Sequence, residues 1–172
     1  TAVRGTVTVT REPAPQPKNL TFKDHLFWQD TLNTGDDSRL RMLILKKSVI
    51  TMREHSRLQL REEAPTPTQP RGKSIVNLLA GSVRAVVEQA ALKDREYEIR
   101  TNIAVAAIRG SDIVGEAISP NEANFYTGPG ATARVTTTGV APADLQPLQR
   151  ARVIPGLIQI TPITRTFYDT LR

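Results

Sequence analysis

The sequence predicts an all-β fold, and three observations carry that prediction. Apolar and polar residues alternate with a period of two, as in "RLRMLIL", where Leu40, Met42 and Ile44 fall on one side. Turn-forming residues separate such runs at short intervals, which is typical of antiparallel sheets. The phrase "SRLRM" at Ser38 returns eighteen residues later as "SRLQL" at Ser56, as a coiled or stacked sheet requires on each pass.

Length and composition exclude several classes of protein. A chain of 172 residues suffices for one domain that buries roughly 70% of the surface of its unfolded chain. The 23 lysines and arginines outnumber the 17 acidic residues, but they alternate with apolar residues through the strands, so we interpret them as solvated strand faces and expect no nucleic-acid partner. The absence of cysteine excludes disulfides and cysteine-ligated metals.

No membrane span is expected, because no stretch approaches the roughly 20 apolar residues that a bilayer crossing needs. The start "TAVRGTV" has no basic and then apolar leader, and we leave open whether one was removed or never existed.

In chain order, the alternating runs predict eight strands. In the run that begins at Arg39, Leu43 falls with Arg39 and Arg41 on the outward side. The runs are "GTVTV" from Gly5, "RLRMLIL" from Arg39, "SVITM" from Ser48, "SRLQL" from Ser56, "SIVNLL" from Ser74, "GSVRAVV" from Gly81, "YEIRT" from Tyr97 and "IAVAAI" from Ile103.

Two proline-rich stretches predict excursions outside the sheet, since proline cannot donate a ladder hydrogen bond. They are "PAPQP" at 13–17 and "APTPTQPRG" at 64–72. The stretch "AVVEQAALKDRE" at 85–96 contains good helix formers, so a three-turn helix is the alternative to strand there. From Asn124 onward, Gly, Thr, Ala and Pro dominate, and we expect an extended, partly irregular tail in which 153–163 returns to the body as a strand.

The order of these motifs resembles the FecR domain, whose pattern runs from a Gly-Asp turn through two Ser-x-Leu-x-Leu strands to a closing Val-Arg-Gly-Thr. The resemblance extends from about Val3 to Val114. Lys46, Lys47 and Ser48 depart from the family's Asp-Gly-Ser turn, and Ser111 replaces its threonine. The matching positions are Gly35, Asp36, Ser38, Leu40, Ser56, Leu58, Leu60, Gly81, Val83, Ala85, Ile108, Arg109, Gly110 and Ser111.

The resemblance implies a twisted, two-layered, sandwich-like β-solenoid over 1–123, followed by the tail at 124–172. Most of the matching positions have a structural interpretation. A serine hydroxyl at a strand entrance can bond the backbone of the preceding turn, and the leucines that follow face the interior. At the closing motif, we expect Gly110 to permit a bend and Arg109 to bond carbonyls of a neighbouring coil.

A search for chemistry predicts neither an enzyme nor a cofactor or metal site. His25 and His55 are the only histidines, and nothing near them has metal-ligand spacing. "RGKS" at 71–74 has the end of a phosphate-binding loop, but Pro67 occupies the position of its first glycine.

The remaining function is binding, and the resemblance implies the bacterial periplasm or outer envelope. We expect a protein-protein interaction module, with three alternatives: a structural subunit of a membrane-associated complex, the sensory domain of a transmembrane signalling regulator, and a glycan or peptidoglycan binder. The partner's identity and the oligomeric state stay open. Aromatic residues make up 5% of the chain, which disfavours the glycan, and the adjacent aromatic pairs 27–28, 125–126 and 167–168 suit a core equally well.

We place the partner contact on the loop at 64–72 and on the tail, because loops on a rigid scaffold are free to carry recognition. The capping of the sheet is the alternative role of the tail. The candidate contact residues are Phe125, Tyr126, Arg150, Arg152, Arg165, Phe167 and Tyr168.

Overall fold

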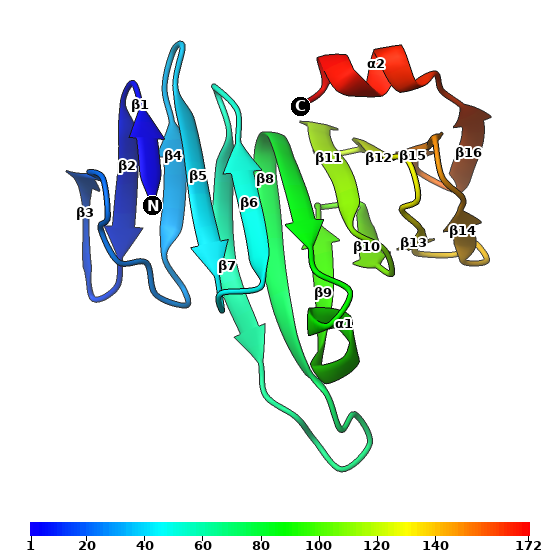
Figure 1. The fold of residues 1–172 in the computed structure, drawn as a ribbon, viewed down its shortest axis with the longest axis horizontal. Coiled ribbons are helices and arrows are strands. Elements are labelled where there is room, and N and C mark those ends of the chain that lie inside the picture. The colour runs from blue at the N-terminus through cyan, green and yellow to red at the C-terminus, as the bar shows by residue number, and fades with distance from the viewer.

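The computed structural model describes residues 1–172 and confirms the all-β class, with 58% of residues in strands and 6% in helices (Figure 1). The strands are β1 (Ala2–Arg4), β2 (Val7–Arg11), β3 (Ala14–Asn19), β4 (Thr31–Thr34), β5 (Arg39–Ile44), β6 (Ser48–Met52), β7 (Arg57–Glu63), β8 (Gly72–Val87), β9 (Arg95–Arg100), β10 (Ala104–Ile108), β11 (Asp112–Ser119), β12 (Glu122–Thr127), β13 (Ala133–Thr137), β14 (Ala143–Leu145), β15 (Gln149–Ile154) and β16 (Leu157–Pro162). The helices are α1 (Ala91–Asp94) and α2 (Arg165–Thr170), and neither is long and apolar enough to cross a bilayer.

Strand β8 organises the sheet because it is long enough to pair with four neighbours. Its first half pairs with β7 and, in parallel, with β9, whereas its second half pairs with β6 and β11. The strands predicted at Ser74 and Gly81 are therefore one strand of 16 residues. The sheet branches at β8 into a front arm, β1-β5-β6-β8-β11-β12-β15-β16, and a back arm, β3-β2-β4-β7-β8-β9-β10-β13-β14. It is an open sheet, and the predicted solenoid is not confirmed.

The core lies between the two arms. Leu40 and Met42 of β5 in the front arm and Leu58 and Leu60 of β7 in the back arm are all buried in one cluster of 30 residues. Burial of each such side chain stabilises the fold by roughly 1.5 to 3 kcal/mol. The two copies of the repeated phrase thus lie on opposing arms of the sheet, and the apolar residues of each copy face the core between them.

The serines of the repeat do bond the preceding turn, as expected. Ser38 Oγ donates to the carbonyl of Asp36 at 2.8 Å and accepts from the backbone N–H of Thr6 at 2.8 Å. Ser56 Oγ lies 3.3 Å from the carbonyl of Glu54 and 3.1 Å from that of Ser82, which share its single proton, and it accepts from the backbone N–H of Ser82 at 2.9 Å. Each hydroxyl therefore ties a turn of its own segment to the backbone of a distant one.

A glycine with positive φ stands against each serine. Gly5 (φ 71°) would bring a Cβ onto Ser38 Oγ, and Gly81 (φ 80°) would bring one onto Ser56 Oγ. Only glycine combines this conformation with so close an approach. The sequence therefore needs a glycine-serine pair at each of the two places where these backbone segments cross.

The expectation that 13–17 leaves the sheet is wrong. Strand β3 contains Pro15 and Pro17 and pairs with β2, but it is an edge strand with every residue exposed. An edge strand has one side free of ladder bonds, so prolines are tolerated there. The second proline-rich stretch is a loop, as predicted, since β7 ends at Glu63 and β8 begins at Gly72. Only the four residues of α1 are helical in the stretch where a three-turn helix was the alternative.

The tail is regular, which corrects the expectation of an irregular path. Strand β12 crosses the boundary drawn at 123/124 and pairs with both β11 and β15. The stretch 153–163 spans the end of β15 and all of β16, which form a hairpin, instead of a single strand. Alanines supply much of the inward alternation here, with Ala133 and Ala151 buried, so the period of two is hidden from a search for large apolar residues.

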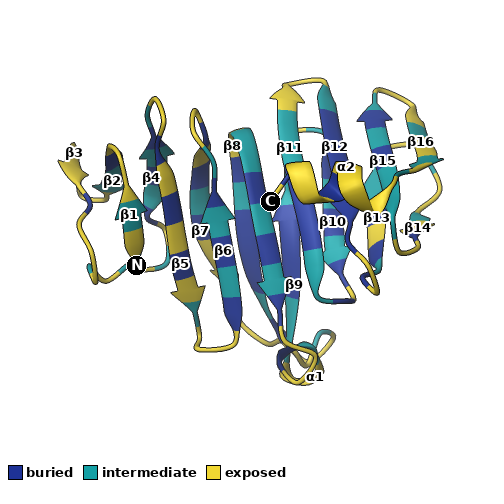
Figure 2. Ribbon diagram, turned by 45° about the horizontal axis from the view of Figure 1, so that its top comes forward, coloured by how far each residue is buried: buried dark blue, intermediate teal, exposed yellow.

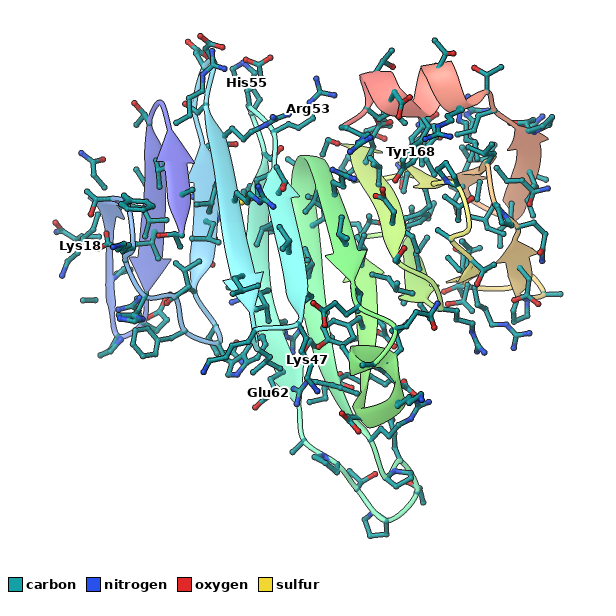
Figure 3. All side chains as sticks on the ribbon, viewed as in Figure 1. Lys18, Lys47, Arg53, His55, Glu62 and Tyr168 are labelled. Atoms are coloured by element: carbon teal, nitrogen blue, oxygen red, sulfur yellow. The ribbon has the colours of Figure 1, made fainter.

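Helix α2 covers the outer face of the front arm, where it lies across β11 and β12 (Figure 2). Tyr168 and Leu171 pack there against Val114 and Tyr126 in a second, smaller apolar cluster. The side chain of Tyr168 points from the helix toward the sheet (Figure 3). The C-terminal segment is therefore part of the packed domain.

Candidate partner-binding site

The positions of the closing motif lie beside the segment that precedes β13. A Cβ on Gly110 would come within 2.8 Å of the backbone nitrogen of Thr132, so the glycine permits a close approach of two segments. The backbone N–H of Arg109 donates to the carbonyl of Thr132 at 3.0 Å, while its side chain is exposed. Arg109 thus joins the neighbouring segment through its main chain, and not through the guanidinium as we expected.

The other positions of the repeated motif are structural. Val83, Ala85 and Ile108 lie in the core cluster, and the N–H of Gly35 donates to the carbonyl of Thr6. Of all the motif positions, only Leu60 lines the surface groove described below.

Three of the seven candidate contact residues are buried. Phe125 belongs to the core between the arms, and Tyr126 and Tyr168 belong to the cluster under α2, so their side chains stabilise the fold and offer no surface to a partner. Two others, Arg165 and Phe167, are exposed on α2.

The last two candidates, Arg150 and Arg152, are half-buried on the outer face of β15. Arg150 donates to the Asn124 side-chain carbonyl, and Arg152 forms an ion pair with Glu122 at 2.7 Å. Of the seven candidates, only Arg165 and Phe167 are thus fully exposed.

A concave apolar surface lies elsewhere, in a groove between the loop at 21–30 and the β5–β6 hairpin. We call it the hairpin groove; its volume is about 630 Å³. Its floor contains the buried side chains of Met42 and Leu60. It is lined by Thr1, Lys23, Asp24, His25, Leu26, Phe27, Trp28, Met42, Leu43, Ile44, Leu45 and Leu60.

The loop that forms one wall of the groove is held by buried polar contacts. The carboxylate of Asp30 is fully buried; it accepts two hydrogen bonds from Arg11, both at 2.7 Å, and one from the N–H of Phe27 at 2.8 Å. The hydrogen bond to this carboxylate raises the pKa of Arg11. The backbones of Asp30 and Leu60 are also bonded, which fixes the wall to β7. The groove is therefore pre-formed.

A second carboxylate, that of Asp24, stabilises the turn at the start of the same loop. Asp24 accepts hydrogen bonds from the N–H and the hydroxyl of Thr21, and these bonds lower its pKa. The hydroxyl of Thr1 reaches the carbonyls of both residues, so the first residue of the chain stabilises the turn.

Large apolar side chains remain exposed around the groove. Leu43 is 61% and Leu45 is 48% exposed on the hairpin, and Phe27 is 56% exposed on the opposite wall. The guanidinium of Arg11 lies 4.4 Å from the centroid of the Phe27 ring, and the ammonium of Lys23 lies 5.3 Å from that of Phe22. An apolar centre with aromatic and cationic residues at its border is the composition of a protein interface.

Sequence reasoning missed this groove. It noted Phe27 beside Trp28 and placed Leu43 on the outward side of its strand, and both placements agree with the structure. The available signal was a run of exposed apolar residues, "LIL", leading into a two-lysine turn, beside an aromatic pair in a loop without alternation. Nothing in the spacing indicated that the two segments meet.

A partly buried polar network holds α2 to the sheet. Asp112 accepts two hydrogen bonds from Arg84, at 2.8 and 2.7 Å, and a third from the hydroxyl of Tyr168 at 2.7 Å. Burial alone would raise the pKa of Asp112, but the bonds from Arg84 and Tyr168 outweigh it and lower that pKa. Burial and the adjacent carboxylate raise the pKa of Tyr168, and burial raises that of Tyr126 to about 12. These tyrosines are therefore neutral at physiological pH.

No group of three or more histidine, cysteine, aspartate or glutamate side chains lies together as metal ligands would. His25 lines the hairpin groove, and His55 Nε2 lies 3.3 Å from Asp36 Oδ1 at an exposed loop tip. The arrangement offers an apolar binding surface.

Comparisons with known proteins identify the family and related folds. The family model described as "FecR protein" matches residues 30–140. Two crystal structures of a protein from Parabacteroides distasonis ATCC 8503, described as a "putative anti-sigma factor", at 2.50 and 1.65 Å resolution, have TM-scores of 0.64 and 12% sequence identity. Each alignment covers 81% of this chain and 62% of the other, so the chain spans less than two thirds of that protein. No curated protein matches the chain.

Proposed function

Since the chain belongs to the FecR protein family, we propose that it is a non-catalytic binding module of a signalling regulator in the bacterial periplasm or envelope. We further propose that it binds an apolar segment of a protein partner in the hairpin groove. The observation that carries this proposal is the pre-formed apolar groove, whose wall is fixed by the buried carboxylate of Asp30.

The physical case for a protein partner rests on exposed apolar area. Leu43, Leu45 and Phe27 project into solvent around one depression, and such a cluster is costly to leave uncovered. Because the loop is already ordered, binding carries little entropic cost for ordering it.

A glycan fits the same groove less well. Sugar rings stack on free aromatic faces, but Arg11 occupies one face of Phe27. Eight of the twelve lining residues are hydrophobic, which suits an apolar segment better than sugar hydroxyls.

Site-specific photo-crosslinking in cells that produce the full-length protein tests the proposal. A photoreactive residue at Leu43 should yield a discrete protein adduct, and Phe27→Asp on the opposite wall should abolish it. The same photoreactive residue at Ile118, which is 54% exposed at the end of β11 and outside the groove lining, is the matched control. Equal adducts at both positions, or an adduct at Leu43 that is unaffected by Phe27→Asp, would contradict the proposal.

A further inference from the structure

The two arms of the sheet end in four edge strands, and three of them are protected against pairing with another chain. At the N-terminal end, β1 has three residues and β3 carries two prolines. At the C-terminal end, β14 has three residues, one of them Asp144. Short strands, prolines and charges are the usual devices that block edge pairing.

Strand β16 has none of these protections along most of its length. It is six residues long, it carries no charge, and its single proline is its last residue. It pairs only with β15, so one side of its backbone is open (Figure 1). Of the four edges, β16 is therefore the one best able to pair with another strand.

The inner side of β16 extends the apolar row of the core to the edge of the sheet, where it is only partly covered. Ile158 and Ile160 lie opposite Val153 and Ala151 of β15, which are both fully buried. Ile158 packs against the core cluster, but Ile160 is 37% exposed. A further strand with apolar residues on this side would cover the open end of the core.

The outer side of the same region carries two arginines. Gln159 and Thr161 of β16 lie opposite Arg152 and Arg150 of β15. Arg152 is neutralised by Glu122. Arg150 forms no ion pair; it donates to the side-chain carbonyl of Asn124, and its guanidinium lies 6.0 Å from the Tyr126 ring. The nearest carboxylate on this face, that of Glu116, accepts hydrogen bonds from Asn124 and Tyr126. A strand added to β16 would lie about 10 Å from β15, within reach of arginine side chains and within about one Debye length at physiological salt.

We propose that β16 accepts an extended segment of a partner protein by strand addition. The segment has apolar side chains on the inner row, toward Ile160, and aspartate or glutamate on the outer row, toward Arg150. Main-chain hydrogen bonds supply the affinity, and the alternation of the two rows supplies the specificity. This surface is separate from the hairpin groove, so the inference does not depend on the proposed function.

The probe is a fluorescent peptide of about ten residues in which valine alternates with glutamate, titrated by anisotropy into the full chain. A valine-lysine peptide of the same length should bind at least about tenfold more weakly, and added salt should weaken the valine-glutamate complex. Ile160→Glu should also weaken it by about tenfold, because a charge enters the apolar row, whereas Leu43→Glu in the groove should leave it unchanged. Equal binding of the two peptides would overturn the charge argument.

Hydrogen exchange on the unmodified chain tests the proposal without any substitution. The peptide should slow exchange at those amides of β16 that point away from β15 and lack a ladder partner in the free protein. Protection at 21–30 instead, or no protection at β16, would overturn the proposal. Sedimentation without peptide gives a further check, because dimers that Ile160→Glu dissolves would mean that a second copy, and not a partner's strand, occupies this edge.

Discussion

Replacing Asp112 with alanine should destabilise the protein more than any comparable change to a surface ion pair. Asp112 accepts a bidentate pair of hydrogen bonds from Arg84 and one from Tyr168. The change leaves a guanidinium without its counter-ion and a buried hydroxyl without its acceptor. Both groups belong to the contact between β8, β11 and α2, so the loss loosens the helix from the sheet.

The magnitude follows from the burial of the pair. Breaking a buried ion pair by removing one partner costs about 3 to 5 kcal/mol. The side chains of Asp112 and Arg84 are 18% and 22% exposed, so water partly replaces the lost contacts. We therefore expect about 3 kcal/mol, which for a chain of this size lowers the melting temperature by about 6 to 12 °C.

Thermal and urea denaturation measure this loss, and Asp144→Ala is the matched control. Asp144 accepts a bidentate pair from Arg134 at 2.9 and 3.1 Å, but both side chains are about half exposed. The control should change stability much less, because solvent screens the pair. If the two variants melted at the same temperature, burial would not govern the strength of the Asp112 pair, and the reasoning would be refuted.

Two further predictions concern a backbone crossing and acid stability. Gly81→Ala should destabilise the chain by about 2 kcal/mol more than Gly130→Ala, since both glycines have positive φ but only at Gly81 would a Cβ meet backbone, 2.6 Å from Ser56 Cα; similar urea midpoints would contradict this. The lowered pKa of Asp112 means that its contribution to stability is present above the ordinary aspartate pKa of about 3.9 and is lost as pH falls below it. The unfolding free energy of the unmodified chain should thus fall more steeply below about pH 3.9 than that of Asp112→Asn, and parallel curves would argue against this assignment.

The sequence by itself determined the strands and their inward faces wherever large side chains alternate. Leu40, Met42, Leu58 and Leu60 face the core as predicted, because alternation along a pleated strand is a local property of the chain. The glycine-serine crossing at Ser56 was visible only as a repeated phrase.

The tertiary structure decided which strands pair and which surfaces stay open. The tail escaped prediction because alanines such as Ala133 and Ala151 supply its inward row, and a small side chain is equally compatible with a loop. The hairpin groove and the free edge of β16 were not predictable, since each depends on segments distant in sequence. Ile160 resembles other apolar strand residues along the chain, and only the absence of a neighbouring strand leaves it exposed.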